Sequence, residues 1–563
     1  MLRRIALALC GVIVATFALA QTPNENILRM HAGVHPTYFC NYTLGQFCGG
    51  EAYSTTSLRT VTDATGAITY APNNLLTYSN TFSNAAWNKN GAPTITINYP
   101  SVADPTGGYA ANRLQGTSSN YIFQNSNVPL GVNGLFSVWL KSTSGATQYV
   151  RIGYYDNTGG NIYSPTLTLG ATWVQYQLPF TVKNTTGSTV SFRSDPGGDA
   201  FDILAYMPVS AAVTYETSPR PGDQVITTSA AYYGPAFDYN ATTLSPIGVR
   251  VEEARTNYQI NSGTWSSAIA DAAGTGSVPT ITANYGVAPD GTTTATRAQL
   301  DKGSGVGYSR FQQITTVTSG VYTDSVWLRT TDGSTVTVGV RAGAATGSTV
   351  TVTGIWTRFN NTMGSSGTVA DIQVLLWNTL ATSQTADLLV WGGQVELGSF
   401  PTSYIPTAAS SVTRAADVVT LQGAASRLLG ATNRPVIVEA SGWPGSSPNR
   451  LLADGSGALV LVSSTTQVGT FNGSTILSAA LGSGTTAGAF RAGVSLLPGK
   501  RYICGNGGSL ASDNNSYTPT GSMSLGSSGS AYFFDGHISK LAIYNRALTG
   551  PQLQSRTVLG APF

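Results

Sequence analysis

The chain has 563 residues, a formal net charge of +3, and a charged fraction of 10%. Ordinary globular domains carry about 25% charged residues, and so small a net charge on so long a chain gives no electrostatic basis for nucleic-acid binding. A hydrophobic fraction of 41% excludes a disordered chain. At about 100–200 residues per domain, the length predicts three or four domains.

Short runs of Thr, Val, Tyr and Trp alternate with turns rich in Gly and Asn, and this pattern is typical of strands rather than helices. We therefore expect an all-β fold of tandem β-sandwich (jelly-roll) domains.

The first 20 residues have the pattern of a secretory signal peptide. Arg3 and Arg4 precede an apolar run that ends in Ala18-Leu19-Ala20. An uncleaved membrane anchor is the alternative, but the run is shorter than the roughly 20 residues of a spanning helix. We expect a mature protein that begins near Gln21, has no membrane span after signal removal, and is secreted to the extracellular space or lies on a virion surface.

Residues 21–73 have the pattern of an irregular lead-in with one hairpin around the turn Asp63–Gly66. In an oxidising compartment Cys40 and Cys48 could pair, leaving Cys504 alone. Two unpaired buried thiols are the alternative. A zinc site is disfavoured because the spacing of these cysteines from His31 and His35 fits no structural zinc pattern.

Three phrases occur twice in the chain, about 186 residues apart. They are Pro93–Tyr99 with Pro279–Tyr285, Ser137–Leu140 with Ser325–Leu328, and Asp202–Tyr206 with Asp387–Trp391. A repeat this long indicates a duplicated domain, and a duplicated module favours multivalent binding over catalysis.

The repeat divides the rest of the chain. We expect sandwiches at residues 74–222 and 257–416, linker strands at 223–256 between them, and a third, unrepeated region at 417–563. Thr549, followed by a proline, predicts the N-cap of a short final helix.

Several segments resemble phrases that recur in tail-fibre and head-fibre proteins of bacteriophages and their prophage relatives. They are Leu75–Trp87, Val287–Gly291, Ile247–Asn257, and Gln394–Thr407 with its continuation Val412–Asp417. The two repeated modules are similar to carbohydrate-binding-module-like β-sandwiches. The third region resembles concanavalin A-like, laminin G-like jelly rolls through Asp535–Leu548.

The resemblance implies a non-enzymatic fibre or adhesin component that recognises a cell-surface polysaccharide or glycan, as a homo-oligomer or with other fibre or virion proteins. One feature departs from it, because fibre proteins are assembled inside the infected cell and do not normally carry a signal peptide. The alternatives are a secreted polysaccharide-degrading enzyme with targeting modules and a purely structural fibre segment.

Sugar binding by sandwich domains needs a flat aromatic ring beside a few polar groups. The predicted ligand contacts are Trp87, Tyr121, Tyr154, Tyr155, Asp156, Trp265, Tyr308, Trp443 and Tyr517. Four other tryptophans occupy equivalent positions of the repeat and are predicted to be core residues, namely Trp139 with Trp327 and Trp173 with Trp356.

No catalytic residue is predicted. Glu252 and Glu253 are adjacent, so in a strand they point to opposite faces and cannot both act on one bond. No Gly-x-Ser-x-Gly elbow or P-loop is present. Asp454–Gly457 and Asp513–Asn515 could ligate calcium, but calcium needs about six to eight oxygens, and turn chemistry accounts for the same residues. No metal or other cofactor is therefore predicted.

Overall fold

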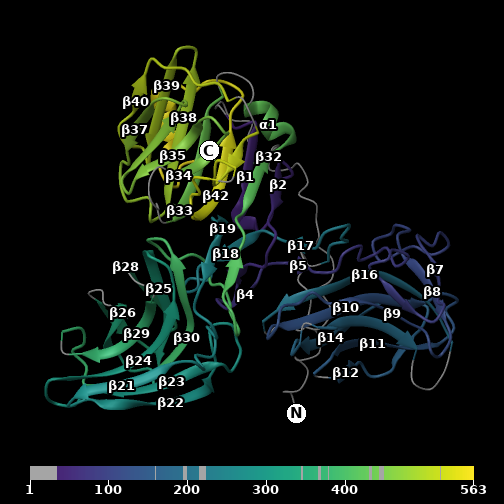
Figure 1. The fold of residues 1–563 in the computed structure, drawn as a ribbon. Coiled ribbons are helices and arrows are strands. Elements are labelled where there is room, and N and C mark those ends of the chain that lie inside the picture. Colours follow the sequence, from purple (N-terminus) through teal and green to yellow (C-terminus); the bar gives the residue numbers. More distant parts are fainter. Residues whose placement is uncertain are drawn as a thin grey trace, which may run out of the picture.

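The computed structural model describes most of residues 35–563. Short gaps lie at 159, 185, 195–199, 215–223, 344–346, 366–368, 378, 430–433, 443–448, 520–521 and 530. The predicted signal peptide lies outside the described residues. Strands make up 51% of the described residues and helices 4%, which confirms the all-β prediction. Figure 1 shows three lobes that meet around β4, β18 and β19.

The first module consists of two antiparallel sheets. One sheet has the order β7-β8-β16-β10-β14, with Thr94–Thr96 (β7), Asn112–Gly116 (β8), Phe201–Val213 (β16), Asn133–Ser142 (β10) and Val174–Thr181 (β14). The other has the order β6-β9-β15-β11-β12, with Asn88–Asn90 (β6), Tyr121–Asn125 (β9), Thr189–Ser194 (β15), Gln148–Asp156 (β11) and Gly160–Tyr163 (β12), and β13 (Leu167–Leu169) also pairs with β11.

The second module repeats this topology. Its first sheet has the order β22-β23-β30-β25-β28, with Ser277–Gly286 (β22), Ala295–Asp301 (β23), Thr385–Leu397 (β30), Gly320–Thr330 (β25) and Thr357–Ser365 (β28). Its second has the order β21-β24-β29-β26-β27, with Ile269–Gly274 (β21), Gly307–Thr316 (β24), Val369–Trp377 (β29), Val336–Ala342 (β26) and Ser348–Val352 (β27). The register also shifts at the same point in both modules, between Ser137 and Trp139 and between Ser325 and Trp327. The duplication read from the sequence is therefore a duplication of topology.

The third lobe is a larger two-sheet sandwich. One sheet contains Ala236–Tyr239 (β18), Pro246–Val251 (β19), Gly536–Ile543 (β42), Val436–Gly442 (β33), Phe490–Leu497 (β38), Lys500–Gly505 (β39) and Ala511–Asp513 (β40), and Tyr38–Asn41 (β1) pairs with β42. The other contains Glu51–Ser54 (β2), Val418–Leu421 (β32), Ser524–Leu525 (β41), Asn449–Ala453 (β34), Ala458–Ser464 (β35), Gln467–Phe471 (β36) and Ile476–Ala480 (β37).

The third lobe thus includes segments from outside residues 417–563. Strands β1 and β2 come from the segment expected to be an irregular lead-in, and β18 and β19 come from the segment expected to be a linker. Because β33 pairs along the whole of β42, strands β1 and β19 pair in succession along the opposite edge of β42. The chain therefore returns to this sandwich before each module and again after the second.

The remaining elements are short. The predicted hairpin around Asp63–Gly66 is confirmed and pairs Thr60–Thr62 (β3) with Ile68–Tyr70 (β4). Two further ribbons pair Asn73–Asn74 (β5) with Tyr232–Tyr233 (β17) and Arg255–Asn257 (β20) with Val412–Arg414 (β31). The helices are Tyr42–Leu44 (η2), Gly423–Leu429 (α1) and Gly550–Thr557 (α2). Thr549 caps α2 as predicted, within a capping box.

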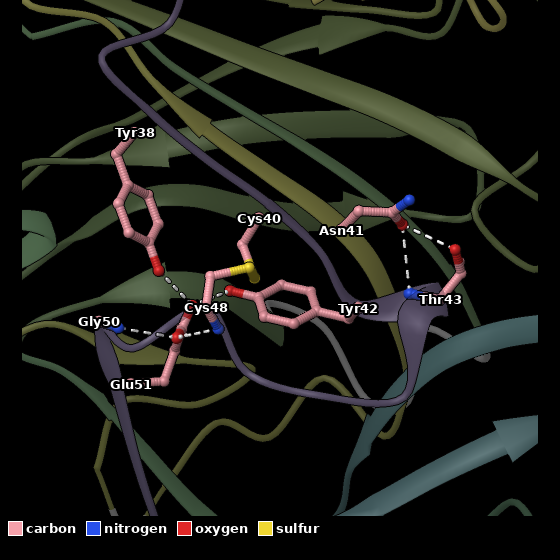
Figure 2. The surroundings of a disulfide bond; sticks show 8 residues. All are labelled: Tyr38, Cys40, Asn41, Tyr42, Thr43, Cys48, Gly50 and Glu51. Atoms are coloured by element: carbon pink, nitrogen blue, oxygen red, sulfur yellow. Dashed lines mark hydrogen bonds between the residues drawn. A yellow bond between two sulfur atoms is a disulfide. The ribbon is translucent and has the colours of Figure 1, made fainter. Parts of the chain in front are cut away.

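A disulfide closes the loop after β1. The predicted pairing of Cys40 with Cys48 is confirmed, with an S–S distance of 2.06 Å (Figure 2). Inside the loop the Glu51 carboxylate accepts hydrogen bonds from the hydroxyls of Tyr38 (2.5 Å) and Tyr42 (2.8 Å). The disulfide and this carboxylate together link β1 to β2, and the two strands join the third lobe by pairing with β42 and β32, respectively. Elsewhere in this lobe Cys504 is buried and forms no disulfide.

A buried carboxylate, Glu252, joins four segments of the chain. It follows β19 and accepts hydrogen bonds from the Ser403 amide (2.8 Å) and hydroxyl (2.6 Å). It also forms an ion pair with Arg414, at the end of β31, and lies 3.6 Å from Arg59, just before β3. All of these charged side chains are nearly inaccessible to solvent.

A second carboxylate, Asp417, completes the cluster. It forms an ion pair with Arg59 and accepts the Tyr53 hydroxyl at 2.5 Å. The backbones of Glu252 and Asp417 are also linked, since the Asp417 amide donates to the Glu252 carbonyl at 2.9 Å. We call these two carboxylates and two guanidiniums (Arg59, Glu252, Arg414 and Asp417) the central cluster. It connects the lead-in, the strand before the second module, and the exit of the second module.

The substitution Glu252→Gln should destabilise the whole chain. Removing one partner of a buried ion pair leaves uncompensated charge, which costs about 3–5 kcal/mol. The adjacent Glu253→Gln is the matched control and should cost less, because the Glu253 side chain is 36% exposed and solvent screens its pair with Arg255. Denaturant titration of both variants measures the difference, and equal stabilities would contradict this role of Glu252.

The carboxyl group of Glu252 should also make the stability of the protein depend on pH in the acidic range. Burial raises its pKa, but the guanidiniums of Arg414, Arg250 and Arg59 outweigh burial and hold the pKa of Glu252 well below its usual 4.5. A lowered folded-state pKa contributes stability above the unfolded-state pKa, and this contribution is lost as the pH falls below that value. The denaturation midpoint should therefore fall between pH 5 and pH 3 more steeply in the native protein than in Glu252→Gln. Parallel pH profiles would contradict this assignment.

Candidate functional site

Four of the eight aromatic residues predicted to contact a ligand lie in the cores. Trp87 is fully buried and packs between Phe82 and Phe192, at ring distances of 4.8 and 5.7 Å. Trp265 is 2% exposed and stacks on Phe311, and Tyr517 is 8% exposed. These three residues hold the sandwiches together, and the prediction that they bind a ligand is wrong.

Tyr154 and Asp156 are also core residues. The Tyr154 ring stacks on Phe180 at 4.1 Å, its hydroxyl donates to the Asp156 carboxylate at 2.9 Å, and burial raises the pKa of Tyr154 to about 12. Both side chains are about 1% exposed. The turn that follows them suggested exposure, but alternate residues of a strand share a face, so Tyr154 and Asp156 point inward with Ile152.

Three predicted tyrosines are not core residues. Tyr155 points to the opposite face from Tyr154 and is 40% exposed. Tyr308 on β24 is half-buried, and Tyr121 on β9 is also half-buried. Trp443 lies outside the described residues.

Trp139 and Trp327 are not core residues, contrary to prediction. Val326 and Leu328 point into the core, so Trp327 between them faces outward and is half-buried. It packs against Trp391 at 5.5 Å and Tyr404 at 5.3 Å on the outer face of the sheet. Trp139 has the same position in the first module and is half-buried too.

The other tryptophan pair is likewise half-buried at the sheet edge. The ring N–H of Trp173 donates to the Ala103 carbonyl at 2.8 Å, and that of Trp356 donates to the Val287 carbonyl at 3.2 Å. These tryptophans therefore fasten a loop of each module rather than fill a core.

Four side chains form the same surface cluster in both modules, which we call the quartet. In the first module Arg113 donates through Nε and Nη2 to the two oxygens of Asp202, at 2.8 and 2.6 Å. Gln115 donates to Asp202 at 3.2 Å, and the guanidinium lies over the Tyr99 ring at 5.5 Å. Arg113 and Gln115 alternate on β8 and therefore share the outer face of the sheet.

The second module reproduces the quartet residue by residue. Arg297 donates to the two oxygens of Asp387 at 2.8 and 2.5 Å, and Gln299 donates to Asp387 at 3.4 Å. The Arg297 guanidinium lies over the Tyr285 ring at 4.8 Å, and this ring is 49% exposed. The side chains of Arg297 and Asp387 are 24% and 33% exposed, so the ion pair faces solvent.

The backbone before each quartet tyrosine adopts a left-handed conformation. Asn98 has a φ of 50° and Asn284 a φ of 51°. Non-glycine residues seldom adopt positive φ, although asparagine is among the least unfavourable. In the second module the register of β22 and β23 also shifts between Thr282 and Gly286. This irregular segment sets the position of Tyr285 beside Arg297.

A hollow of about 360 Å³ lies on the second module beside the quartet. It is formed by β22, β23 and β30. Its lining residues are Ser277, Val278, Thr280, Gln299, Leu300, Asp301, Thr385, Ala386 and Asp387. Carboxylates, an amide and hydroxyls thus converge on a solvent-accessible depression that includes two members of the quartet.

The quartet carboxylates remain ionised in mild acid. The hydrogen bonds from Arg113 and Arg297 hold the pKa values of Asp202 and Asp387, respectively, below the usual 3.8. Each quartet therefore offers fixed acceptors on the carboxylate and donors on the arginine and glutamine. The arrangement suits hydroxyl groups, which both donate and accept.

The quartet was missed in the sequence although its signal was present. The repeated phrases contain its tyrosine and aspartate, and Arg113-Leu-Gln115 matches Arg297-Ala-Gln299. A search for polar residues kept in both copies finds it. A search for aromatic residues near turns does not.

The two acidic turns considered for calcium are engaged by their own surroundings. Asp454 accepts the amides of Ser456 (2.8 Å) and Gly457 (2.6 Å), and Asp513 pairs with Arg501. Within the described ranges, no group of three or more His, Cys, Asp and Glu side chains could hold a metal ion. Among the helices that the structure describes, none is long and apolar enough to cross a membrane.

No protein-family model matches the chain, and no curated protein is significantly similar to it. Solved structures give low-scoring similarities. The tandem CBM22-1–CBM22-2 domain of Xyn10C from Paenibacillus barcinonensis is 12% identical, covers 58% of this chain and 98% of its own, and has a TM-score of 0.21. The single CBM22-1 xylan-binding domain of the same protein is 14% identical over 25% of this chain and 92% of its own, with a TM-score of 0.20.

The M60 catalytic domain with the CBM51-1 and CBM51-2 domains of ZmpB from Clostridium perfringens is 9% identical over 61% of this chain and 43% of its own, with a TM-score of 0.18. Scores of this size do not establish a shared function.

The corrected positions of the tryptophans predict different costs within one module. Trp87→Ala should destabilise the protein by about 3–5 kcal/mol, because it removes a fully buried ring. Trp139→Ala should cost clearly less, because this ring is half-exposed and its loss leaves no closed cavity. Thermal or denaturant unfolding of the two variants measures the difference. Equal costs would place Trp139 in the core after all.

Proposed function

We propose that this chain is a non-enzymatic fibre or adhesin component that recognises a neutral glycan through the two quartets, one on each module. The observation that carries the proposal is that the same tyrosine, arginine, aspartate and glutamine recur with the same contacts in both copies. The two copies serve as an internal comparison, because each has the same fold but lies in a different part of the chain.

The chemistry of the quartet suits a sugar ring. An exposed tyrosine such as Tyr285 offers a flat apolar surface to the C–H face of a pyranose. Beside it, Asp387 and Gln299 offer an acceptor and a donor to neighbouring hydroxyls. The quartet itself carries no net charge, since Asp387 neutralises Arg297, and this favours a neutral saccharide.

A purely structural role does not account for the quartet residues. Surface ion pairs contribute about 0–1 kcal/mol, and the cores of both modules are built from other residues. Keeping four half-exposed side chains for stability alone would therefore bring little benefit.

Two weak, equivalent sites on one chain suit a dense surface polysaccharide. Once one site is occupied, the second binds at a high effective concentration, so the tandem binds far more tightly than either module. The disulfide between Cys40 and Cys48 is typical of an oxidising compartment, which supports an extracellular or virion-surface location. The resemblance of Gln394–Thr407 to fibre proteins supports a fibre or adhesin context.

The test compares tyrosine variants of the full chain on a glycan array and on immobilised polysaccharide. Tyr99→Ala and Tyr285→Ala each remove one predicted platform, and the double variant removes both. Tyr109→Ala is the matched control, because Tyr109 is 58% exposed in the first module but lies outside the quartet. Each single variant should bind at least about tenfold more weakly than the native chain, because avidity is lost, and the double variant should lose binding.

The other outcomes separate the alternatives. Binding by the double variant equal to that of Tyr109→Ala would remove the quartets as the site. No binding to any glycan by the native chain would favour a structural fibre segment. Release of reducing ends from the polysaccharide would favour a degrading enzyme.

A further inference from the structure

The first module carries a second aromatic surface, on its other sheet. The register of β9, β15, β11 and β12 aligns Tyr121 with Arg193, and Phe123 with Ser191, Gly153 and Tyr163. Since pairing residues share a face of a sheet, these side chains lie on one outer surface. Ser191 and Gly153 lie between the Phe123 and Tyr163 rings in this row, and neither has a large side chain to separate the two rings.

Arg193 is held between two tyrosines on this surface. Its guanidinium lies 4.8 Å from the centre of the Tyr163 ring and 5.6 Å from that of Tyr121. It also donates through Nη1 to the Tyr163 hydroxyl. Gly153 makes this arrangement possible, because a Cβ at this position would come within 2.7 Å of the Tyr163 ring. The charge is therefore fixed in place by aromatic rings.

The remaining edge of this guanidinium has no partner in the described part of the chain. Three comparable arginines on the outer faces, Arg113, Arg297 and Arg310, use Nε and Nη2 to hold both oxygens of an aspartate. Arg193 is half-buried, and no ion pair or hydrogen bond of its Nε and Nη2 edge is found within the described ranges. Among the described residues, this planar fork therefore faces no carboxylate.

The corresponding surface of the second module is built differently. Arg310 there is neutralised by Asp271 on the neighbouring strand. Gly339, the counterpart of Gly153, is covered by Leu375 and Leu380, with approaches of 3.1 and 2.9 Å to a Cβ at this position. In the described part of the second module, the surface that corresponds to the setting of Arg193 is therefore built differently.

We propose that this surface of the first module binds the anionic group of an acidic saccharide, with Arg193 gripping the anion and Tyr121 or Tyr163 supporting the sugar ring. A guanidinium presents parallel donors that match a carboxylate, sulfate or phosphate. Asn88 and Asn90 on β6 pair with Phe123 and Tyr121 and so lie on the same face, where their side chains can form hydrogen bonds with the hydroxyl groups of the sugar. This inference rests on the proposed function for the class of ligand but uses a different sheet and a different charge.

The experiment measures binding of the full chain to polygalacturonate and to its fully methyl-esterified form, in which a methyl ester replaces each charged carboxylate. Dextran sulfate and dextran form a second pair that separates sulfate from carboxylate recognition. The variants are Arg193→Ala, Arg193→Lys and the matched control Arg310→Ala. Thermal unfolding of each variant establishes that it is folded.

The native chain should bind a polyanion at least about tenfold more tightly than the matched neutral polymer, and Arg193→Ala should remove this preference. Arg193→Lys should recover it only in part, because a lysine keeps the charge without the fork. Arg310→Ala should bind as the native chain does. An unchanged preference in Arg193→Ala, or no preference in the native chain, would overturn the inference.

The quartet variants separate this inference from the proposed function. The double variant Tyr99→Ala, Tyr285→Ala should keep the preference for the polyanion while losing the neutral glycan. Loss of both types of binding in that double variant would overturn a separate acidic site. Binding of neutral glycans without any preference for anions would leave the proposed function in place and remove only this inference.

Discussion

The arrangement of the lobes depends on the central cluster around Glu252. A buried carboxylate is tolerated only when charged and hydrogen-bonding partners replace the water it has lost. For Glu252 those partners are Arg59, in the lead-in, and Ser403 and Arg414, in the exit of the second module. The lead-in, the strand between the modules and the exit of the second module must therefore all be in place before any of these charges is satisfied. This requirement explains why the chain returns repeatedly to the third lobe.

The segments Gln394–Thr407 and Val412–Asp417 both supply residues that contact or belong to the central cluster. In Gln394–Thr407, Gln394 accepts the Ile405 amide at 2.7 Å, and Glu396 accepts the amide and hydroxyl of Thr402 at 2.8 and 2.7 Å. The phrase that ends at Asp417 supplies Arg414 and Asp417 to the cluster. The bonds of Gln394 and Glu396 fix the Gln394–Thr407 segment locally, whereas Ser403, Arg414 and Asp417 join the exit of the second module to the central cluster.

Local signals predicted local structure well. Turn residues around Asp63–Gly66, the cap at Thr549 and the close pair of cysteines need only neighbouring residues, and the repeat gave the two modules. The partners of β1, β2, β18 and β19 could not be predicted, because alternation shows that a strand has an inner face but not which sheet it joins. The same limit applied to the site. Tyr154 and Tyr155 look alike beside a turn, yet the pleat sends one into the core, and the quartet draws its members from strands far apart in the sequence.

We therefore propose that recognition takes place on the outer faces of the sheets, where both modules carry a neutral quartet and the first module also carries Arg193 between two tyrosines. The most direct test of this central claim is a crystal structure of the chain with a neutral oligosaccharide that the array identifies. The account predicts sugar rings on Tyr99 and Tyr285, with hydroxyls bonded to Asp202 and Asp387. A sugar bound instead on the third lobe, or away from both quartets, would contradict it.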